Sequence, residues 1–207
     1  MPSSIGCEQA ASSNATPYLE KPVPRIPLPS LEELTPEQRR VHDAVVSGPR
    51  GALRGPLRAA IHNPELADKW QQLGELLRFR TSLPPRLSEL AILVTARHWD
   101  CQFEWYAHEP PALKGGVTVT VIEAIRHGRR PALDKPDEIA VYDYATELHA
   151  THFASEATYR RALDLLGVVG IVELTALLGY YSMVAMTLNA HQLLPPADVA
   201  PPLPPRA

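Results

Sequence analysis

The chain has 207 residues, a length that suits one domain of ordinary size with a substantial hydrophobic core. Its formal net charge is −3 and its basic and acidic residues are interspersed, which argues against a basic face for nucleic acid and a polybasic anchor for a membrane. A small-molecule substrate fits this surface better. The 2 cysteines are too few for a disulfide framework and suit a reducing cytoplasm, where we expect the protein to reside.

The two ends of the chain differ in composition from its middle. Residues 1–25 are rich in Ser, Ala and Pro and carry few large apolar side chains, so they cannot bury enough surface to offset the entropy of ordering. We expect a disordered N-terminal tail there, a helical domain over residues 26–196, and a Pro-rich tail over residues 197–207. Protease should trim residues 1 to about 20 and residues 198–207 without lowering the melting temperature.

Helical periodicity indicates about eight helices and no convincing strand, so we predict the all-α fold class. A capping box with proline at the first helical position, Thr35-Pro36-Glu37-Gln38, opens a helix that should run to Val46. After a loop, Asn63-Pro64 opens a strongly amphipathic helix. Further helices are expected over residues 85–99, 100–109, 118–128, 135–149, 155–167 and 167–190, the last as a buried core helix rather than a membrane span.

The chemistry is concentrated in residues 89–108, ELAILVTARHWDCQFEWYAH. Asp100 can cap a second helix in this stretch, because its carboxylate can accept from the free N–H groups of the next turn. Cys101 then lies in the first turn, where the peptide dipoles favour thiolate over thiol. The alternative that Cys101 is an inert buried thiol stays open. Pro110-Pro111 should end or kink this helix, and Gly115-Gly116 should close the unit.

Glu104 follows Cys101 by three residues and His108 follows Glu104 by four, so the three side chains project from one side of the helix. A carboxylate and an imidazole at this spacing can exchange protons. Glu89 can join them only if the two helices fold back on each other. The alternatives are that Glu104 and His108 form a mere surface pair and that Glu89 only favours a helix N-terminus.

Aromatic residues beside Glu104 indicate partial burial, in which a carboxylate and an imidazole shift each other's pKa. Trp105 is our candidate for contact with a substrate, although a core position is the alternative. His62, next to Asn63-Pro64, could also line a pocket, but a surface or core histidine is an equal reading. We predict no metal ligand and no cofactor.

Residues 173–191 repeat the pattern of residues 89–108, with nearly the same separation between Glu173 and His191 as between Glu89 and His108. The second copy lacks the cysteine and the middle glutamate. This suggests a degenerate internal repeat in which one half kept the site. A chance likeness between two long apolar helices remains the alternative.

Residues 89–108, together with Gly55-Pro56 upstream and LTALLGYYSMVAMTLNAH downstream, resemble the carboxymuconolactone decarboxylase family, whose relatives include the alkylhydroperoxidase D proteins. The resemblance covers roughly residues 50–195. It implies an all-helical fold, active sites near subunit contacts, and a homotrimer or homohexamer.

In the alkylhydroperoxidase D branch, a glutamate precedes a Cys-x-x-Cys pair and a histidine. By the same spacing these positions fall on Glu89, Cys101, Glu104 and His108. Because glutamate replaces the second cysteine, which would attack the peroxide, the chain cannot form and reopen that disulfide. The resemblance therefore implies a thiol-poor member of the decarboxylase type.

Four functions are consistent with these residues. The first is a cofactor-free lyase in which Glu104 and His108 transfer protons while a small carboxylated lactone or related acid loses carbon dioxide. The second is a one-cysteine hydroperoxide reductase of peroxiredoxin type acting through Cys101. A metal site at Glu89, Glu104 and His108 ranks third, near a non-catalytic oligomeric binding protein. We predict the lyase.

Overall fold

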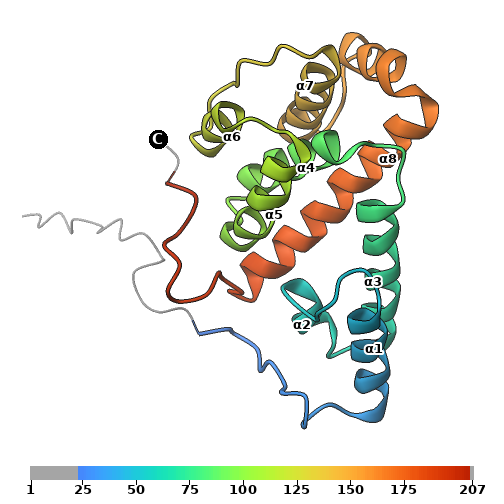
Figure 1. The fold of residues 1–207 in the computed structure, drawn as a ribbon, viewed down its shortest axis with the longest axis vertical. Coiled ribbons are helices and arrows are strands. Elements are labelled where there is room, and N and C mark those ends of the chain that lie inside the picture. The colour runs from blue at the N-terminus through green and yellow to red at the C-terminus, as the bar shows by residue number, and fades with distance from the viewer. Residues whose placement is uncertain (1–22, 206–207) are drawn as a thin grey trace, which may run out of the picture.

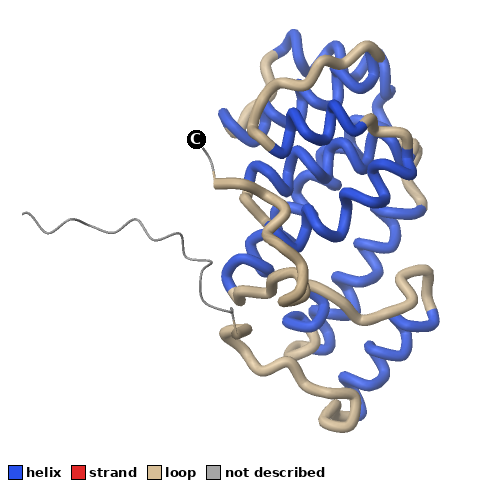
Figure 2. The backbone as a smooth tube through the Cα atoms, turned by 60° about the vertical axis from the view of Figure 1, so that its left-hand side comes forward, coloured by secondary structure: helices blue, strands red, loops and turns tan. Residues whose placement is uncertain are grey.

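The computed structural model describes residues 23–205 and is built from helices and loops alone, as Figures 1 and 2 show. The predicted all-α class is confirmed for these residues. The predicted tail up to residue 22 lies outside them, while Arg25 is already tied to the domain by a backbone hydrogen bond to His191 (3.0 Å). The helices are α1 (Pro36–Ser47), α2 (Pro56–Ala60), α3 (Pro64–Phe79), α4 (Pro85–His98), α5 (Gln102–Gly115), α6 (Val119–Arg126), α7 (Pro136–Thr151) and α8 (Glu156–Ala190).

Helix α4 lies at the centre of the molecule, where it contacts α5, α6, α7 and α8. Its leucine and alanine residues are buried on several sides, and Leu90, Ala91 and Leu93 are wholly inaccessible to solvent. Figure 1 shows α8 running diagonally between two groups of helices, with α4 to α7 on one side and α1 to α3 on the other. Both groups pack against α8, so the two halves share its buried face.

The helix starts follow the capping signals in the sequence. The side chain of Thr35 accepts from the Gln38 amide (3.3 Å) and that of Gln38 accepts from the Thr35 amide (3.0 Å), so the predicted capping box is confirmed. Asn63 likewise caps α3. The short helix α2 was not predicted, although Pro56 at its first position carried a signal for it.

Pro110 and Pro111 do not end α5, which continues to Gly115. The prediction of an end there was therefore wrong. Each proline removes one backbone hydrogen bond, but the helix also buries Trp105, His108 and Ala112, and this packing holds the last turns in place. The predicted stop at the glycine pair is confirmed, since Gly116 caps the helix with a φ of 101°.

Helix α8 combines the last two predicted helices, which meet at a bend where Gly167 has φ 69° and ψ 176°. Within the described residues, α8 is the one helix long and apolar enough to cross a membrane by length and composition. Core helices meet the same criterion. Leu174, Leu177 and Leu188 are fully buried, whereas Val168, Val169 and Val172 are exposed, so the helix is buried along one face and the prediction of a buried core helix holds for that face alone.

The C-terminal segment docks on the domain, which corrects the prediction of a loose tail. Leu203 is buried, its amide donates to Gln102 Oε1 (2.9 Å), and Gln102 Nε2 donates to its carbonyl (3.0 Å). Arg97 Nη1 also donates to the Pro204 carbonyl (2.9 Å). The compositional argument failed because a Pro-rich segment keeps its carbonyl groups free to accept from side chains of a neighbouring helix.

Candidate functional site

Helices α4 and α5 pack against each other and bring Glu89 to His108, which confirms the conditional prediction that they could meet. His108 Nδ1 lies 2.7 Å from Glu89 Oε2, and His108 Nε2 lies 3.1 Å from Glu104 Oε1. One imidazole is therefore held between two carboxylates. This fixes the ring in one orientation and favours a proton on each nitrogen.

The ionisation of this group follows from its surroundings. Only 4% of His108 and 3% of Glu104 is exposed. Burial alone would lower the pKa of His108, but the charge of Glu89 and the hydrogen bonds to both carboxylates outweigh it and raise the pKa to about 9. His108 is thus an imidazolium at neutral pH. It donates from Nδ1 to Glu89 and from Nε2 to Glu104.

Glu104 and His108 lie on the wall of a cavity of about 420 Å³, which we call the inner pocket. Elements from four parts of the chain enclose it: the loop before α2, the end of α3, and facing turns of α5 and α8. Glu89 is not among its lining residues, so it lies behind the histidine. The inner pocket is also lined by Arg50, Arg54, Arg78, Phe103, Tyr180 and Tyr181.

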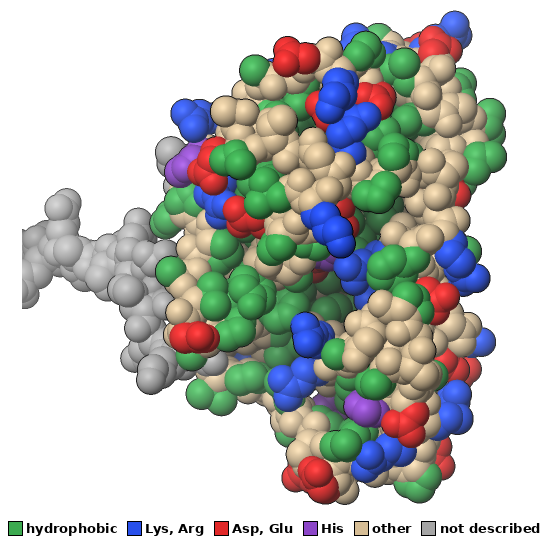
Figure 3. Space-filling model, in the orientation of Figure 1, with side chains coloured by type: hydrophobic (Ala, Val, Ile, Leu, Met, Phe, Trp, Pro, Cys, Tyr) green, Lys and Arg blue, Asp and Glu red, His purple; other side chains and the backbone are tan. Residues whose placement is uncertain are grey.

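Three buried donors in this lining have no hydrogen-bond acceptor among the described residues: Arg50 Nε, Arg78 Nε and Tyr181 Oη. Burying an unsatisfied polar group costs free energy, so such groups call for a ligand or water. Arg50 Nη2 also donates to the Tyr180 hydroxyl (3.1 Å), which fixes part of its guanidinium. Figure 3 shows basic side chains beside a hollowed, hydrophobic part of this face.

Cys101 does not have the character predicted for it. Asp100 adopts a φ of 48° and does not cap α5, so Cys101 itself is the N-cap residue. The side chain is fully buried, and burial, followed by the nearby charge of Glu104, raises the pKa of the thiol far above its ordinary value. Desolvation outweighs the dipole effect, so the prediction of a favoured thiolate was wrong. Cys101 does not line the inner pocket.

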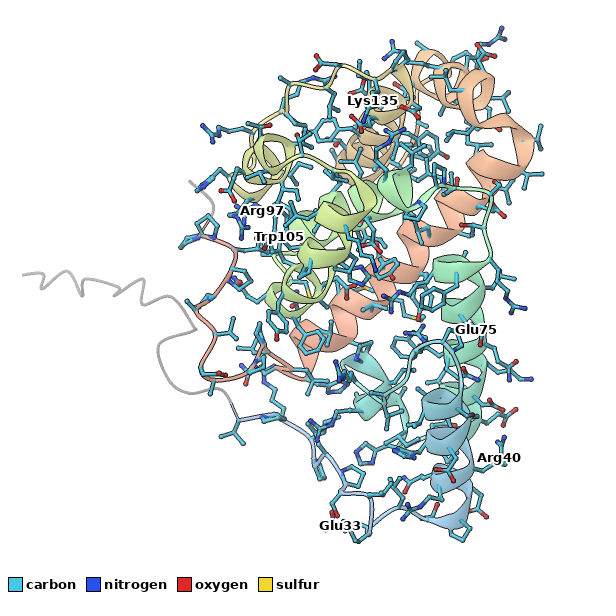
Figure 4. The ribbon with its side chains drawn as sticks, in the orientation of Figure 1. Glu33, Arg40, Glu75, Arg97, Trp105 and Lys135 are labelled. Carbon is cyan, nitrogen blue, oxygen red and sulfur yellow. The ribbon has the colours of Figure 1, made fainter. Side chains whose placement is uncertain are left out.

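The two predicted substrate contacts also lie elsewhere. Trp105 is fully buried, and its indole N–H donates to Glu109 Oε2 (3.0 Å). Figure 4 shows it near Arg97, on the side of α5 that faces the C-terminal segment. His62 is exposed and its Nε2 lies 2.8 Å from the Pro27 carbonyl. Neither residue lines the inner pocket.

The residues missed by sequence reasoning are the basic and phenolic groups of the inner pocket. Arg50 lies in the glycine-containing loop before α2, and Tyr180 and Tyr181 lie in the GYY segment of α8. The GYY segment belongs to a stretch that resembles the family, but no role was predicted for its tyrosines or for the loop. Nothing in the spacing along the chain, however, relates Arg50 or Arg78 to His108, because the contact depends on how α3 and α8 pack.

A metal ion would need a ring nitrogen of His108 as a ligand. Both nitrogens face carboxylates within hydrogen-bonding distance, which makes the ring a proton carrier rather than a free donor to a metal. Within residues 23–205, no group of three or more His, Cys, Asp or Glu side chains has an arrangement that could hold a metal ion.

Gly74 permits the close approach of α3 to the inner pocket. A Cβ atom there would lie 2.0 Å from both Arg50 Nη2 and the Tyr180 hydroxyl, whereas one at Gly179 would meet nothing within 4 Å. We expect Gly74→Ala to lower the free energy of unfolding by about 1–3 kcal/mol through overpacking. Gly179→Ala, the matched control, should raise it by about 0.5–1 kcal/mol because alanine favours the helix. Urea unfolding measures the change in the free energy of unfolding for both variants. Changes of the same sign would contradict the packing described.

The model of the carboxymuconolactone decarboxylase family matches residues 64–147, which include Glu89, Cys101, Glu104 and His108. No curated protein matches the sequence. An uncharacterized peroxidase-related protein from Silicibacter sp. TM1040 has a similar structure, with a TM-score of 0.70 and 18% identity over 87% of this chain and 96% of that chain.

Two further solved structures share the fold. An alkylhydroperoxidase AhpD core from Ralstonia eutropha JMP134, an uncharacterized peroxidase-related protein, has a TM-score of 0.69 and 16% identity over 86% of this chain and 95% of that chain. A protein of unknown function from Agrobacterium tumefaciens has a TM-score of 0.61 and 15% identity over 70% of this chain and 100% of that chain. Residues 64–147 of the chain therefore match the model of the carboxymuconolactone decarboxylase family, and the all-α fold around them is similar to that of the AhpD-like proteins.

Proposed function

We propose that the protein is a cofactor-free carboxy-lyase that acts on a small carboxylated lactone or a related acid. The observation that carries the proposal is the buried Glu89–His108–Glu104 arrangement on the wall of a basic pocket. It pairs a proton donor with two carboxylates that favour its charged, protonated form. The family match is consistent with this chemistry.

The proposed reaction needs one proton. When the bond between the substrate carbon and its carboxylate breaks, carbon dioxide leaves and the electron pair remains on the rest of the substrate as an enolate-like anion. His108, an imidazolium at neutral pH, gives its Nε2 proton to that anion. Water then supplies a proton to His108 through the pocket. The positive charges of His108 and the arginines stabilise the anion as it forms.

The two carboxylates have different roles in this proposal. Glu104 lines the inner pocket with His108, so it contacts the substrate and can share the transferred proton. Glu89 lies behind the ring and holds Nδ1, which makes it a positioning residue that also maintains the charge on His108. A neutral group in place of Glu89 should lower the pKa of His108 and move the alkaline limb of the activity profile to lower pH.

A screen of small lactone acids, read out as release of carbon dioxide, tests the function directly. We expect turnover by the full chain and its loss in His108→Ala. His62→Ala is the matched control, because this histidine lies outside the inner pocket. Turnover of no carboxylated lactone or related acid across the screen would contradict the lyase.

The second candidate is a one-cysteine hydroperoxide reductase, which the descriptions of two similar structures as peroxidase-related favour. In that reaction a thiolate would attack the peroxide and become a sulfenic acid, which an external thiol would reduce. The burial of Cys101 and the raised pKa of its thiol argue against it. Peroxide turnover that disappears in Cys101→Ser would favour this candidate over the lyase.

We also propose that the protein forms a homotrimer or homohexamer. Leu66, Leu73 and Leu76 follow one another along one side of the amphipathic helix α3 and are 49%, 44% and 44% exposed. Contact with another copy would bury them. Light scattering at micromolar concentrations should show an oligomer that Leu73→Lys weakens, and a monomer throughout would contradict assembly.

A further inference from the structure

A second cavity of about 520 Å³ adjoins the inner pocket, and we call it the outer pocket. The two share Arg54, Gly55, Phe103 and Tyr106 in their linings. The outer pocket lies between the chain before α1 and the segment that follows α8. These four residues therefore form a common wall between two neighbouring cavities.

The inner pocket is built for an anion. Arg50, Arg54 and Arg78 line it, whereas Glu104 is its one lining carboxylate among the described residues, and that carboxylate already faces His108. The unsatisfied donors on Arg50, Arg78 and Tyr181 point to a ligand with acceptor oxygens. Tyr181 is only 2% exposed, so solvent reaches its hydroxyl only through the cavity. A carboxylate supplies two acceptor oxygens and one negative charge.

The outer pocket has the opposite character. Leu28, Leu53, Leu194 and Pro195 contribute apolar surface to it from three parts of the chain, before α1, before α2 and after α8. Its basic residues, Arg54 and Arg58, are exposed. An apolar group placed here would leave water for a lining that is mainly hydrocarbon, which favours binding in proportion to the area buried.

Phe103 lies between the basic inner pocket and the mainly apolar outer pocket. Its ring lies so close to Gly55 that a Cβ atom on this residue would be 2.8 Å from Cε1 of the ring, and Gly55 also has a φ of 55°. Glycine therefore both permits the local turn and leaves room for the ring. The aromatic edge lies where the charged head and the apolar body of a ligand would meet.

We propose that the site binds an amphipathic carboxylic acid, with its carboxylate on Arg50, Arg78 and Tyr181 and its apolar body in the outer pocket. The ligand proposal takes the position of the reacting carboxylate from the proposed lyase function. It adds the chemical class of the substrate. A small polar lactone would fill the inner pocket alone. An acid with an alkyl or aryl substituent fills both.

Isothermal titration calorimetry with butyrate, hexanoate and octanoate tests the proposal without any turnover. Each methylene that enters the outer pocket should tighten binding about fourfold. Octan-1-ol, which has the same chain without the charge, should bind at least tenfold more weakly than octanoate. Binding that does not change with chain length, or equal binding of the alcohol, would overturn the proposal.

Variants test which pocket binds the carboxylate of the ligand and which binds its alkyl chain. Arg78→Gln should weaken octanoate binding at least tenfold, while Arg80→Gln, two residues further on and outside both pockets, should leave it unchanged. Leu194→Asp should remove the dependence on chain length and spare butyrate, and Leu53→Asp on another part of the wall should do the same. Melting curves confirm that each variant is folded. Loss of butyrate binding in both leucine variants would overturn the assignment of the outer pocket.

These measurements test the proposed ligand class and the proposed lyase activity independently. If alkanoates bind with the expected dependence but no acid releases carbon dioxide, the ligand class stands and the lyase is wrong. If carboxylated lactones turn over but chain length has no effect on binding, the lyase stands and the amphipathic ligand is wrong.

Discussion

His108→Ala is expected to lower the rate of carbon dioxide release by about 10²- to 10⁴-fold, the usual contribution of a general acid or base. The variant removes the proton that the proposed enolate-like anion receives and leaves Glu89 and Glu104 facing each other across a buried gap. The measurement is kcat and KM on the best acid found in the screen. The loss should fall mainly on kcat, because the arginines that we propose bind the substrate remain.

Cys101→Ser provides the contrast. Serine keeps nearly the size of cysteine and is a favourable residue at an N-cap, the position that Cys101 occupies, so the fold should tolerate it. If His108 is the proton donor, most of the lyase activity should remain. A variant that loses all activity, while His108→Ala is only slowed, would reverse the assignment and place the thiol at the centre of the reaction.

The sequence predicted most helices because their start signals are local. The capping box at Thr35, the Asn63-Pro64 pair and the serine at position 155 each act through side chains a few residues apart. The errors occurred where packing overrides local signals. Pro110 lies inside a helix because α5 is held by its buried face, and Leu203 is docked by Gln102, a residue about a hundred positions away.

The site was predicted only in part, because some of its contacts lie within one helix and others depend on how the helices pack. Glu104 and His108 are four residues apart on one helix, so their contact is a property of the helix itself. Glu89 was named as a conditional member, since its contact requires α4 to fold back on α5. Arg50 and Arg78 could not be predicted, because they reach the pocket only through the packing of α3 and α8. The burial that raises the pKa of the Cys101 thiol is equally a property of the assembled core.

The buried imidazolium should also make stability depend on pH. The pKa of His108 is raised from its ordinary value of 6.5 to about 9, so the folded state binds a proton that the unfolded state releases between these values. The stabilisation is complete below pH 6.5 and is lost as pH rises through 9. We expect the free energy of unfolding to fall by on the order of 3 kcal/mol over this range, because a tenfold difference in proton affinity corresponds to about 1.4 kcal/mol.

Urea unfolding at several pH values between 6.5 and 9 measures this dependence, with His108→Gln as the control. Two other groups with shifted pKa values also contribute to the pH dependence of stability. Burial, followed by the charge of His98, lowers the pKa of His149 to about 4, so its effect lies between pH 4 and 6.5 and has the opposite sign. Burial keeps the Cys101 thiol protonated in the folded state, so its effect follows the ionisation of the unfolded thiol around its ordinary pKa of 9.0, at the upper edge of the window, and has the same sign as that of His108. A wild-type slope that persists unchanged in His108→Gln would show that another group carries it, and that His108 is not the charged residue that the lyase requires.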